Sequence, residues 1–215
     1  MKEIAIFGAG GFGKEVACLI AQINEAGGEW NLVGFFDDGV EKGTQISHYG
    51  QVLGGVKELN EWPSQLSVAI AIGSPHALRF VQERINNPNI SFPNLIHPVF
   101  TILDKESFKI GKGNIILAAC YVSCNTSIGD FNILNGEVVM GHDATIGNYN
   151  VLMPDIKVSG EVKIGEENLI GIGTIILQQI KIGTGVHIGA GAVLMTKPKD
   201  GCTYIGNPAR RFKFE

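Results

Sequence analysis

The feature that most constrains the fold is an aliphatic side chain at every sixth position from residue 110 to residue 194. A period of six matches neither the 3.6-residue repeat of a helix nor the two-residue alternation of a strand. It matches a chain that winds round a triangular prism, with six residues per side and 18 per coil. The sequence therefore predicts a parallel β-helix of about five coils with these fifteen side chains pointing inward: Ile110, Ile116, Val122, Ile128, Leu134, Met140, Ile146, Leu152, Val158, Ile164, Ile170, Ile176, Ile182, Ile188 and Leu194.

Two further patterns support the β-helix. The dipeptide Ile-Gly recurs at 110, 128, 146, 164 and 182, which is a spacing of 18 residues. Small residues are expected to turn the corners, and the positions two before each inward side chain are small, β-branched or Asn, as in Cys120, Thr126, Asn132, Val138, Ala144 and Asn150.

Residues 1–95 follow a different pattern, in which strand-like and helix-like segments alternate. Strands are expected within 2–11, 31–38 and 67–74, and helices within 12–27, 54–62 and 76–87. This alternation, with glycines after the first strand, is typical of doubly wound α/β folds. We therefore expect a Rossmann-like half domain over 1–95 and the β-helix domain over 96–215, with residues 197–215 as a tail folded on the last coil.

Composition excludes several classes of function. The net charge of −4 argues against a general nucleic-acid or anionic-membrane binder. The N-terminus has no apolar signal-peptide core, and no run of 18 apolar residues could span a membrane. The four cysteines lack a zinc-binding spacing, so we expect reduced thiols in a cytoplasmic protein.

A glycine-rich loop is the candidate nucleotide site of the N-terminal half. It matches GxGxxG directly after a strand and at the start of a helix, where free N–H groups attract a phosphate. A P-loop is excluded because Lys14 is not followed by Ser or Thr. The alternative is that the glycines only make a tight turn and the acids after the next strand only cap it. The candidate substrate-binding residues are Gly8, Gly10, Gly11, Phe12, Gly13, Asp37 and Asp38, the two acids as acceptors from ribose hydroxyls.

Ser74 and Arg79 lie at and after the end of the third strand, where a doubly wound sheet exposes its ligand edge. Arg79 could hold a phosphate, although a helix-surface arginine fits the pattern at least as well.

His142 is the candidate general base of the β-helix, because it lies at a corner two residues past inward-facing Met140. Gly160 occupies the same corner one coil later, about 4.8 Å away. A base beside an unshielded N–H is the arrangement that acyl transfer requires, and Asp143 could orient the ring. A surface histidine is the competing interpretation. His142 and His187 are two and a half coils apart, so no metal site is expected.

Residues just before the inward positions should face outward. One such column (Lys109, Ser127, Thr145, Lys163, Lys181) is polar, whereas another (Ile115, Ile133, Val151, Leu169) is apolar. An exposed apolar stripe favours self-association, with a three-fold ring as the natural closed symmetry.

With these residues the chain resembles the hexapeptide-repeat acyltransferases, and more closely the group of sialic acid O-acetyltransferases and nucleotide-amino-sugar N-acetyltransferases. The resemblance covers GAGGFGKEV, FFDD, LIHP, the repeat array and IGNPAR. It implies a left-handed β-helix, a homotrimer, acetyl-CoA as co-substrate and a nucleotide sugar in the N-terminal domain. It also implies that His142 is the base, Asp143 its partner and Gly160 the amide that contacts the thioester, and that the cofactor-binding segments are Gly189, Ala190 and Gly191 with Asn207, Pro208 and Ala209.

The chain departs from this group at two positions. Val151 stands where many members have a second histidine, and Phe12 where sugar-nucleotide members often have one. We expect acetyl-CoA-dependent acetylation of the amino group of a nucleotide-linked sugar in bacterial surface-glycan synthesis. The alternatives are O-acetylation of a sugar of the sialic acid type and a non-catalytic nucleotide-sugar-binding scaffold.

Overall fold

The computed structural model describes residues 1–213. The chain divides into two units, Met1–Pro98 and Val99–Glu215. The division expected from the sequence, between residues 95 and 96, lies three residues earlier. Among the described residues, no helix combines the length and the apolar character needed to cross a bilayer.

The first unit contains a parallel five-stranded sheet of order β3-β2-β1-β4-β5. Its strand order reverses between β1 and β4, so the loops after these two strands flank the crevice in which such sheets bind ligands. The predicted strands and helices are present. The short strands β3, β5 and β6, of three, two and two residues, were not expected. The elements are β1 (Lys2–Phe7), α1 (Gly11–Glu25), β2 (Trp30–Phe36), β3 (Val52–Gly54), α2 (Val56–Asn60), β4 (Leu66–Ile70), α3 (Pro75–Arg84), β5 (Ile90–Ser91) and β6 (Leu95–Ile96).

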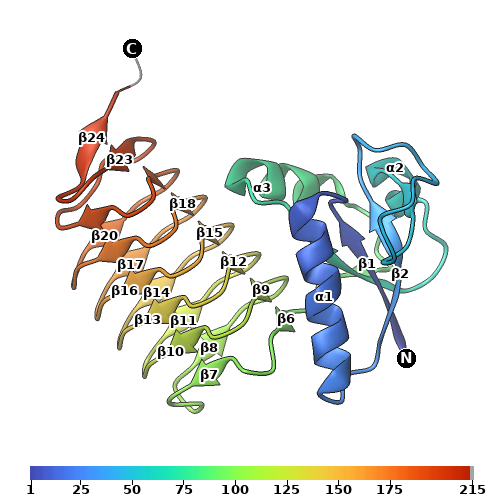
Figure 1. The fold of residues 1–215 in the computed structure, drawn as a ribbon, viewed down its shortest axis with the longest axis horizontal. Coiled ribbons are helices and arrows are strands. Elements are labelled where there is room, and N and C mark those ends of the chain that lie inside the picture. The colour runs from blue at the N-terminus through green and yellow to red at the C-terminus, as the bar shows by residue number, and fades with distance from the viewer. Residues whose placement is uncertain (214–215) are drawn as a thin grey trace. The chain divides into compact units, whose positions relative to one another are not determined.

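The second unit is a left-handed parallel β-helix, whose short strands stack coil upon coil in three sheets (Figure 1). One face has the strands β7 (Thr101–Ile102), β10 (Tyr121–Val122), β13 (Val139–Met140), β16 (Lys157–Val158), β19 (Ile175–Ile176) and β22 (Val193–Leu194). The next has β8 (Lys109–Ile110), β11 (Ser127–Ile128), β14 (Thr145–Ile146), β17 (Lys163–Ile164) and β20 (Lys181–Ile182). The last has β9 (Ile115–Ile116), β12 (Ile133–Leu134), β15 (Val151–Leu152), β18 (Leu169–Ile170) and β21 (His187–Ile188), continued by β23 (Thr203–Ile205) and β24 (Arg210–Phe212).

The six-residue aliphatic series forms the core of the β-helix. From Ile116 onward each of these side chains is at most 3% exposed. Each pairs with its equivalent 18 residues away, as Ile128 does with Ile146. The β-helix begins at β7, before the first predicted position, so the coil count differs slightly from that expected. The tail folds on the last coil as predicted, with β23 parallel to β21 and β24 antiparallel to β23.

The expectation that small residues turn the corners is wrong for one recurring corner position. From Gly113 onward, the third residue before each inward side chain is left-handed, with φ of +54° at Phe131 and +57° at Asp143. Glycine occupies this position at 113, 173, 185 and 191, whereas at 131 and 149 large side chains occupy it and stack on each other across coils. Phe131 and Tyr149 do so with ring centroids 5.5 Å apart and planes 3° from parallel.

Four buried asparagines form a ladder at the corner that contains Phe131 and Tyr149: Asn114, Asn132, Asn150 and Asn168. The Nδ2 of Asn150 donates to the carbonyl of Gly165 at 2.8 Å, and its backbone N–H donates to Oδ1 of Asn132 at 2.9 Å. Buried amide groups need such partners, so the ladder ties consecutive coils together.

The apolar column expected to face solvent is instead mostly buried. Ile115, Ile133 and Val151 are 1%, 2% and 1% exposed. Leu169 is half-buried, so the column is not the exposed apolar stripe from which self-association was expected. The polar column is confirmed, since Lys109, Lys163 and Lys181 are exposed.

Candidate functional site

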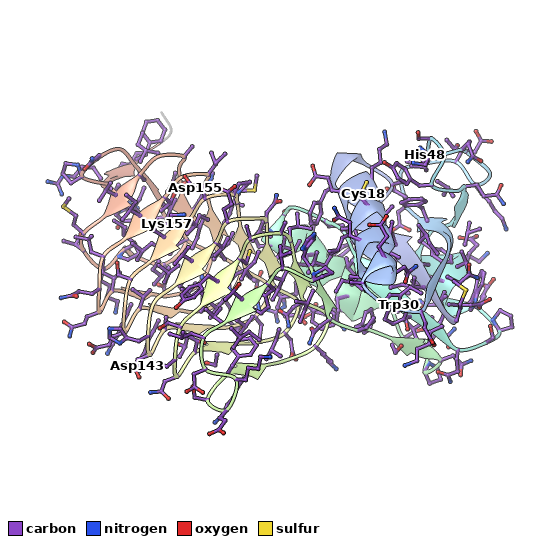
Figure 2. The ribbon with its side chains drawn as sticks, turned by 60° about the horizontal axis from the view of Figure 1, so that its bottom comes forward. Cys18, Trp30, His48, Asp143, Asp155 and Lys157 are labelled. Carbon is purple, nitrogen blue, oxygen red and sulfur yellow. The ribbon has the colours of Figure 1, made fainter. Side chains whose placement is uncertain are left out.

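His142 lies at the corner that follows β13, and Asp143 is its left-handed corner residue. The imidazole Nδ1 is 2.7 Å from Oδ2 of Asp143, and the two side chains are 57% and 48% exposed. A neutral imidazole has a single N–H, which this carboxylate holds on Nδ1. The lone pair is then on Nε2, where a general base needs it. Figure 2 shows Asp143 at one edge of the β-helix, away from Asp155 and Lys157.

Gly160 lies beside this lone pair, on the next coil. A Cβ atom on Gly160 would stand 2.5 Å from Nε2 of His142, so glycine is the residue that leaves room for the ring. No acceptor for the Gly160 N–H is present among residues 1–213. The structure therefore brings together an imidazole lone pair and an unshielded backbone donor.

The Asp143 carboxylate is stabilised in its charged form. The hydrogen bond from His142, followed by one from the Asn125 side chain, lowers the pKa of Asp143 below its ordinary value. A groove of about 640 Å³ lies beside it, lined by Asn125, Asp143, Thr145, Glu161, Lys163, Gln179 and Lys181. Sequence reasoning missed Asn125. The sequence feature that could have identified it is a polar residue 18 positions before Asp143, at the same corner one coil earlier.

The two candidate cofactor segments lie next to each other in the last coils. The Gly189 N–H donates to the carbonyl of Tyr204 at 2.8 Å, and the Ala209 N–H donates to the carbonyl of Val193 at 2.9 Å. Gly191 is left-handed, with φ of +65°, and a side chain there would meet nothing within 4 Å. These segments occupy a different corner from His142, with β19 and β22 between the two corners.

Ala190 is exposed between the two glycines, and Asn207 and Pro208 are exposed in the tail. Val151 is buried on β15, so its side chain reaches no open site.

The glycine loop after β1 contains two kinds of glycine. A Cβ on Gly8 would stand 2.6 Å from the carbonyl oxygen of Ala71, and one on Gly13 would overlap the carbonyl of Gly8. These two glycines are required by packing. Added side chains at Gly10 and Gly11 would meet nothing within 4 Å, so these positions border open space that a ligand could approach. Phe12 is partly exposed.

Both acids after β2 have partners within the protein. Asp37 accepts hydrogen bonds from the N–H groups of Ala9 and Gly39, each at 2.8 Å. Asp38 accepts from Val56 N–H at the start of α2, and its other oxygen is 2.8 Å from Arg84. Both also line a cavity of about 290 Å³. Asp37 therefore ties the glycine loop to the end of β2, while Asp38 caps α2.

Ser74 and Arg79 have local contacts. The Ser74 hydroxyl caps α3 by accepting from Ala77 N–H at 3.4 Å, and Arg79 pairs with Glu83 at 2.8 Å. Gly73, which sequence reasoning missed, follows β4, and an added side chain there would meet nothing within 4 Å. Its signal was a glycine at the end of an apolar strand.

Within the described part of the chain, no group of three or more His, Cys, Asp or Glu side chains is placed to hold a metal ion.

Two family models match the chain. Residues 3–85 match the PglD N-terminal domain, and residues 161–195 match the bacterial transferase hexapeptide (six repeats). A search of curated proteins finds no significant match.

Three solved structures show similarity over nearly the whole chain. The acetyltransferase domain of PglB from Neisseria gonorrhoeae is 32% identical, with a TM-score of 0.87 and coverage of 99% of this chain and 100% of that one. That domain has also been solved in complex with acetyl coenzyme A. WeeI from Acinetobacter baumannii is 28% identical, with a TM-score of 0.88 and the same two coverages. PerB from Caulobacter crescentus, solved with CoA and GDP-perosamine, is 24% identical, with a TM-score of 0.83 and coverages of 99% and 98%, and this likeness shows the fold alone.

Proposed function

Because the chain belongs to the hexapeptide-repeat acyltransferases, in the group of sialic acid O-acetyltransferases and nucleotide-amino-sugar N-acetyltransferases, we propose that it transfers the acetyl group of acetyl-CoA to an amino group of a nucleotide-linked sugar. The observation that carries this proposal is the imidazole lone pair of His142 facing Gly160, with Nδ1 held by Asp143. The product would serve bacterial surface-glycan synthesis.

The chemistry follows from this arrangement. The acceptor amine attacks the thioester carbonyl, and His142 takes the proton that the attacking nitrogen loses. The negative charge that develops on the carbonyl oxygen is stabilised by the Gly160 N–H. The C–S bond then breaks, the proton passes to the departing thiolate, and the products are the amide and the CoA thiol. Asp143 stabilises the imidazolium formed between these two proton transfers.

The surface between the two corners suits the aliphatic arm of acetyl-CoA. Ile175, Leu177 and Met195 are 39%, 39% and 47% exposed there. They lie on or next to β19 and β22, between the glycine segment at Gly189–Gly191 and the His142 corner. We place the cofactor along this face, with Asn207 and Pro208 of the tail near its far end.

We place the nucleotide of the acceptor at the glycine loop of the first unit. The open positions at Gly10, Gly11 and Gly73 support this placement, because they surround the reversal of strand order between β1 and β4. Asp37 and Asp38 support it less directly, since both have internal partners.

The proposed assembly is a homotrimer. Its support is the resemblance to the group, which implies a trimer, together with exposed apolar side chains outside the proposed cofactor face, such as Ile172 at 52% and Ile205 at 42% exposed. Acetyl-CoA is a cytoplasmic metabolite, so the proposal implies a cytoplasmic location.

The test is incubation of the purified full chain with acetyl-CoA and a panel of nucleotide-linked amino sugars. Nucleotide sugars with hydroxyls in place of the amine and free sialic acid serve as comparisons. Thiol release and product mass are followed, with His142→Ala as the control. We expect release with an amino sugar and a new amide. Acetylation of hydroxyls alone would favour the O-acetyltransferase, and nucleotide-sugar binding without any turnover would favour the scaffold.

A further inference from the structure

Asp143 has two neighbours, one for each carboxylate oxygen. Its Oδ2 lies 2.7 Å from the imidazole of His142, and its Oδ1 accepts a hydrogen bond of 3.1 Å from Nδ2 of Asn125. Asn125 is the residue at the same corner one coil earlier. An exposed carboxylate held by a single partner can rotate, whereas one held at both oxygens has a fixed plane.

Asn125 is itself held by the first coil. Its backbone N–H donates to Oγ of Ser107 at 2.8 Å, and the Ser107 hydroxyl donates to Oδ2 of Asp104 at 2.6 Å. The Ser107 hydroxyl also keeps the pKa of Asp104 below its ordinary value, so this acceptor stays charged. With φ of +53°, Asn125 adopts a left-handed conformation that asparagine tolerates well. Asn125 is thus held through its backbone N–H on one side and holds Asp143 through its side chain on the other.

We propose that Asn125 is a positioning residue of the reaction, which fixes the Asp143 carboxylate so that the imidazole keeps its proton on Nδ1 and its lone pair on Nε2. This inference rests on the proposed function, because a base on Nε2 matters only if His142 accepts a proton. A neutral histidine in water favours the tautomer with the proton on Nε2. The hydrogen bond to Asp143 must therefore hold the other tautomer, and it can do so only while the carboxylate faces the ring.

The tautomer can be measured without any substrate. Nitrogen NMR of the imidazole in the full chain, at a pH where the ring is neutral, distinguishes a proton on Nδ1 from one on Nε2. We expect the Nδ1–H form to predominate in the wild type, and Asn125→Ala and Asn125→Asp to shift the population toward Nε2–H. The aspartate variant keeps the size of the side chain but loses the donor. If both variants keep the wild-type tautomer, the proposal is overturned.

Asn148 offers a matched control at another corner. Its Nδ2 donates to Oε1 of Glu166 at 3.0 Å, across the same spacing of 18 residues. Its Oδ1 also accepts from Asp130 N–H at 2.7 Å, so Asn148→Ala should cost at least as much thermal stability as Asn125→Ala. We expect Asn148→Ala to leave the His142 tautomer unchanged. An equal tautomer shift in both variants would reduce Asn125 to a merely structural residue.

Activity provides the second readout. Asn125→Ala should lower kcat about tenfold, the rate equivalent of one charge-assisted hydrogen bond, with the KM for acetyl-CoA unchanged. A loss confined to KM would contradict positioning. If the wild type transfers no acetyl group to any acceptor, the proposed function fails, while the tautomer measurement still decides the role of Asn125.

Discussion

The α-carbon of Gly160 lies so close to the His142 ring that a methyl group on it would stand 2.5 Å from Nε2. Two residues 18 apart in the sequence thus share one small space at a corner of the β-helix. In the proposed reaction that space must hold the attacking nitrogen and the thioester carbonyl. Because this space is small, a single added methyl group can test whether the two residues act together.

Gly160→Ala should disable the enzyme without unfolding it. The added methyl would contact the exposed ring of His142, which can rotate away. The fold is therefore kept, but the general base is displaced. We expect kcat to fall about 100-fold or more, as for loss of a general base. Gly147→Ala is the contrast, because its methyl would stand 2.5 Å from the carbonyl oxygen of Gly165, a backbone atom that cannot move cheaply. It should lower the melting temperature clearly. An active Gly160→Ala variant would mean that the ring and this glycine do not act together.

His142→Ala tests the base itself. Removing a general base typically costs about 100- to 10,000-fold in rate, whereas removing a surface histidine costs almost nothing. The loss should appear in kcat, because the proton moves only in the transition state. Binding of acetyl-CoA, measured by calorimetry, should be unchanged. A variant that keeps more than about a tenth of the wild-type kcat would exclude His142 as the base.

The core of the β-helix could be predicted from the sequence because burial forces a six-residue period on its inward side chains. The burial of the outward apolar column at Ile115, Ile133 and Val151 could not be predicted, because the six-residue period shows only which way a side chain points from its own coil. The His142–Gly160 contact followed from the 18-residue coil alone. Asn125 was missed because an exposed polar corner residue resembles any other until its partner on the next coil is known.

The buried thiol of Cys120 predicts a loss of stability at alkaline pH. The side chain is 1% exposed, and burial raises its pKa from an ordinary value of 9.0 to about 11. Below pH 9 the thiol is protonated in both states, so its contribution to stability is complete. Between pH 9 and 11 it ionises in the unfolded chain only, so the free energy of unfolding should fall, by on the order of 2 kcal/mol.

Urea unfolding of the wild type and Cys120→Ala across this range isolates the effect of the thiol from that of other titrating groups. The variant should be less stable at pH 8, because it loses buried volume, but its stability should fall less steeply above pH 9. If the free energy of unfolding falls with pH equally in the two proteins, the thiol has the same pKa in the folded and unfolded states.

Gly10→Val tests the nucleotide site. Gly10 precedes α1 with φ of −79°, which a valine can adopt, and its Cβ would meet nothing within 4 Å. The fold should therefore tolerate the change, while the branched side chain fills the space through which a phosphate would approach the N–H groups at the start of α1. We expect the affinity for a nucleotide sugar to fall at least about tenfold, which is roughly 1.4 kcal/mol.

The affinity of Gly10→Val for acetyl-CoA should be unchanged, since the candidate cofactor segments lie in the other unit. Gly13→Ala is the control for general damage to the fold, because its Cβ would overlap the carbonyl of Gly8. Loss of folded protein in this variant should weaken the binding of both ligands. Titration calorimetry of each variant with a nucleotide sugar and with acetyl-CoA separates these cases. If Gly10→Val binds the nucleotide sugar as tightly as the wild type does, the ligand does not approach the glycine loop, and the cavity lined by Asp37 and Asp38 becomes the site to examine next.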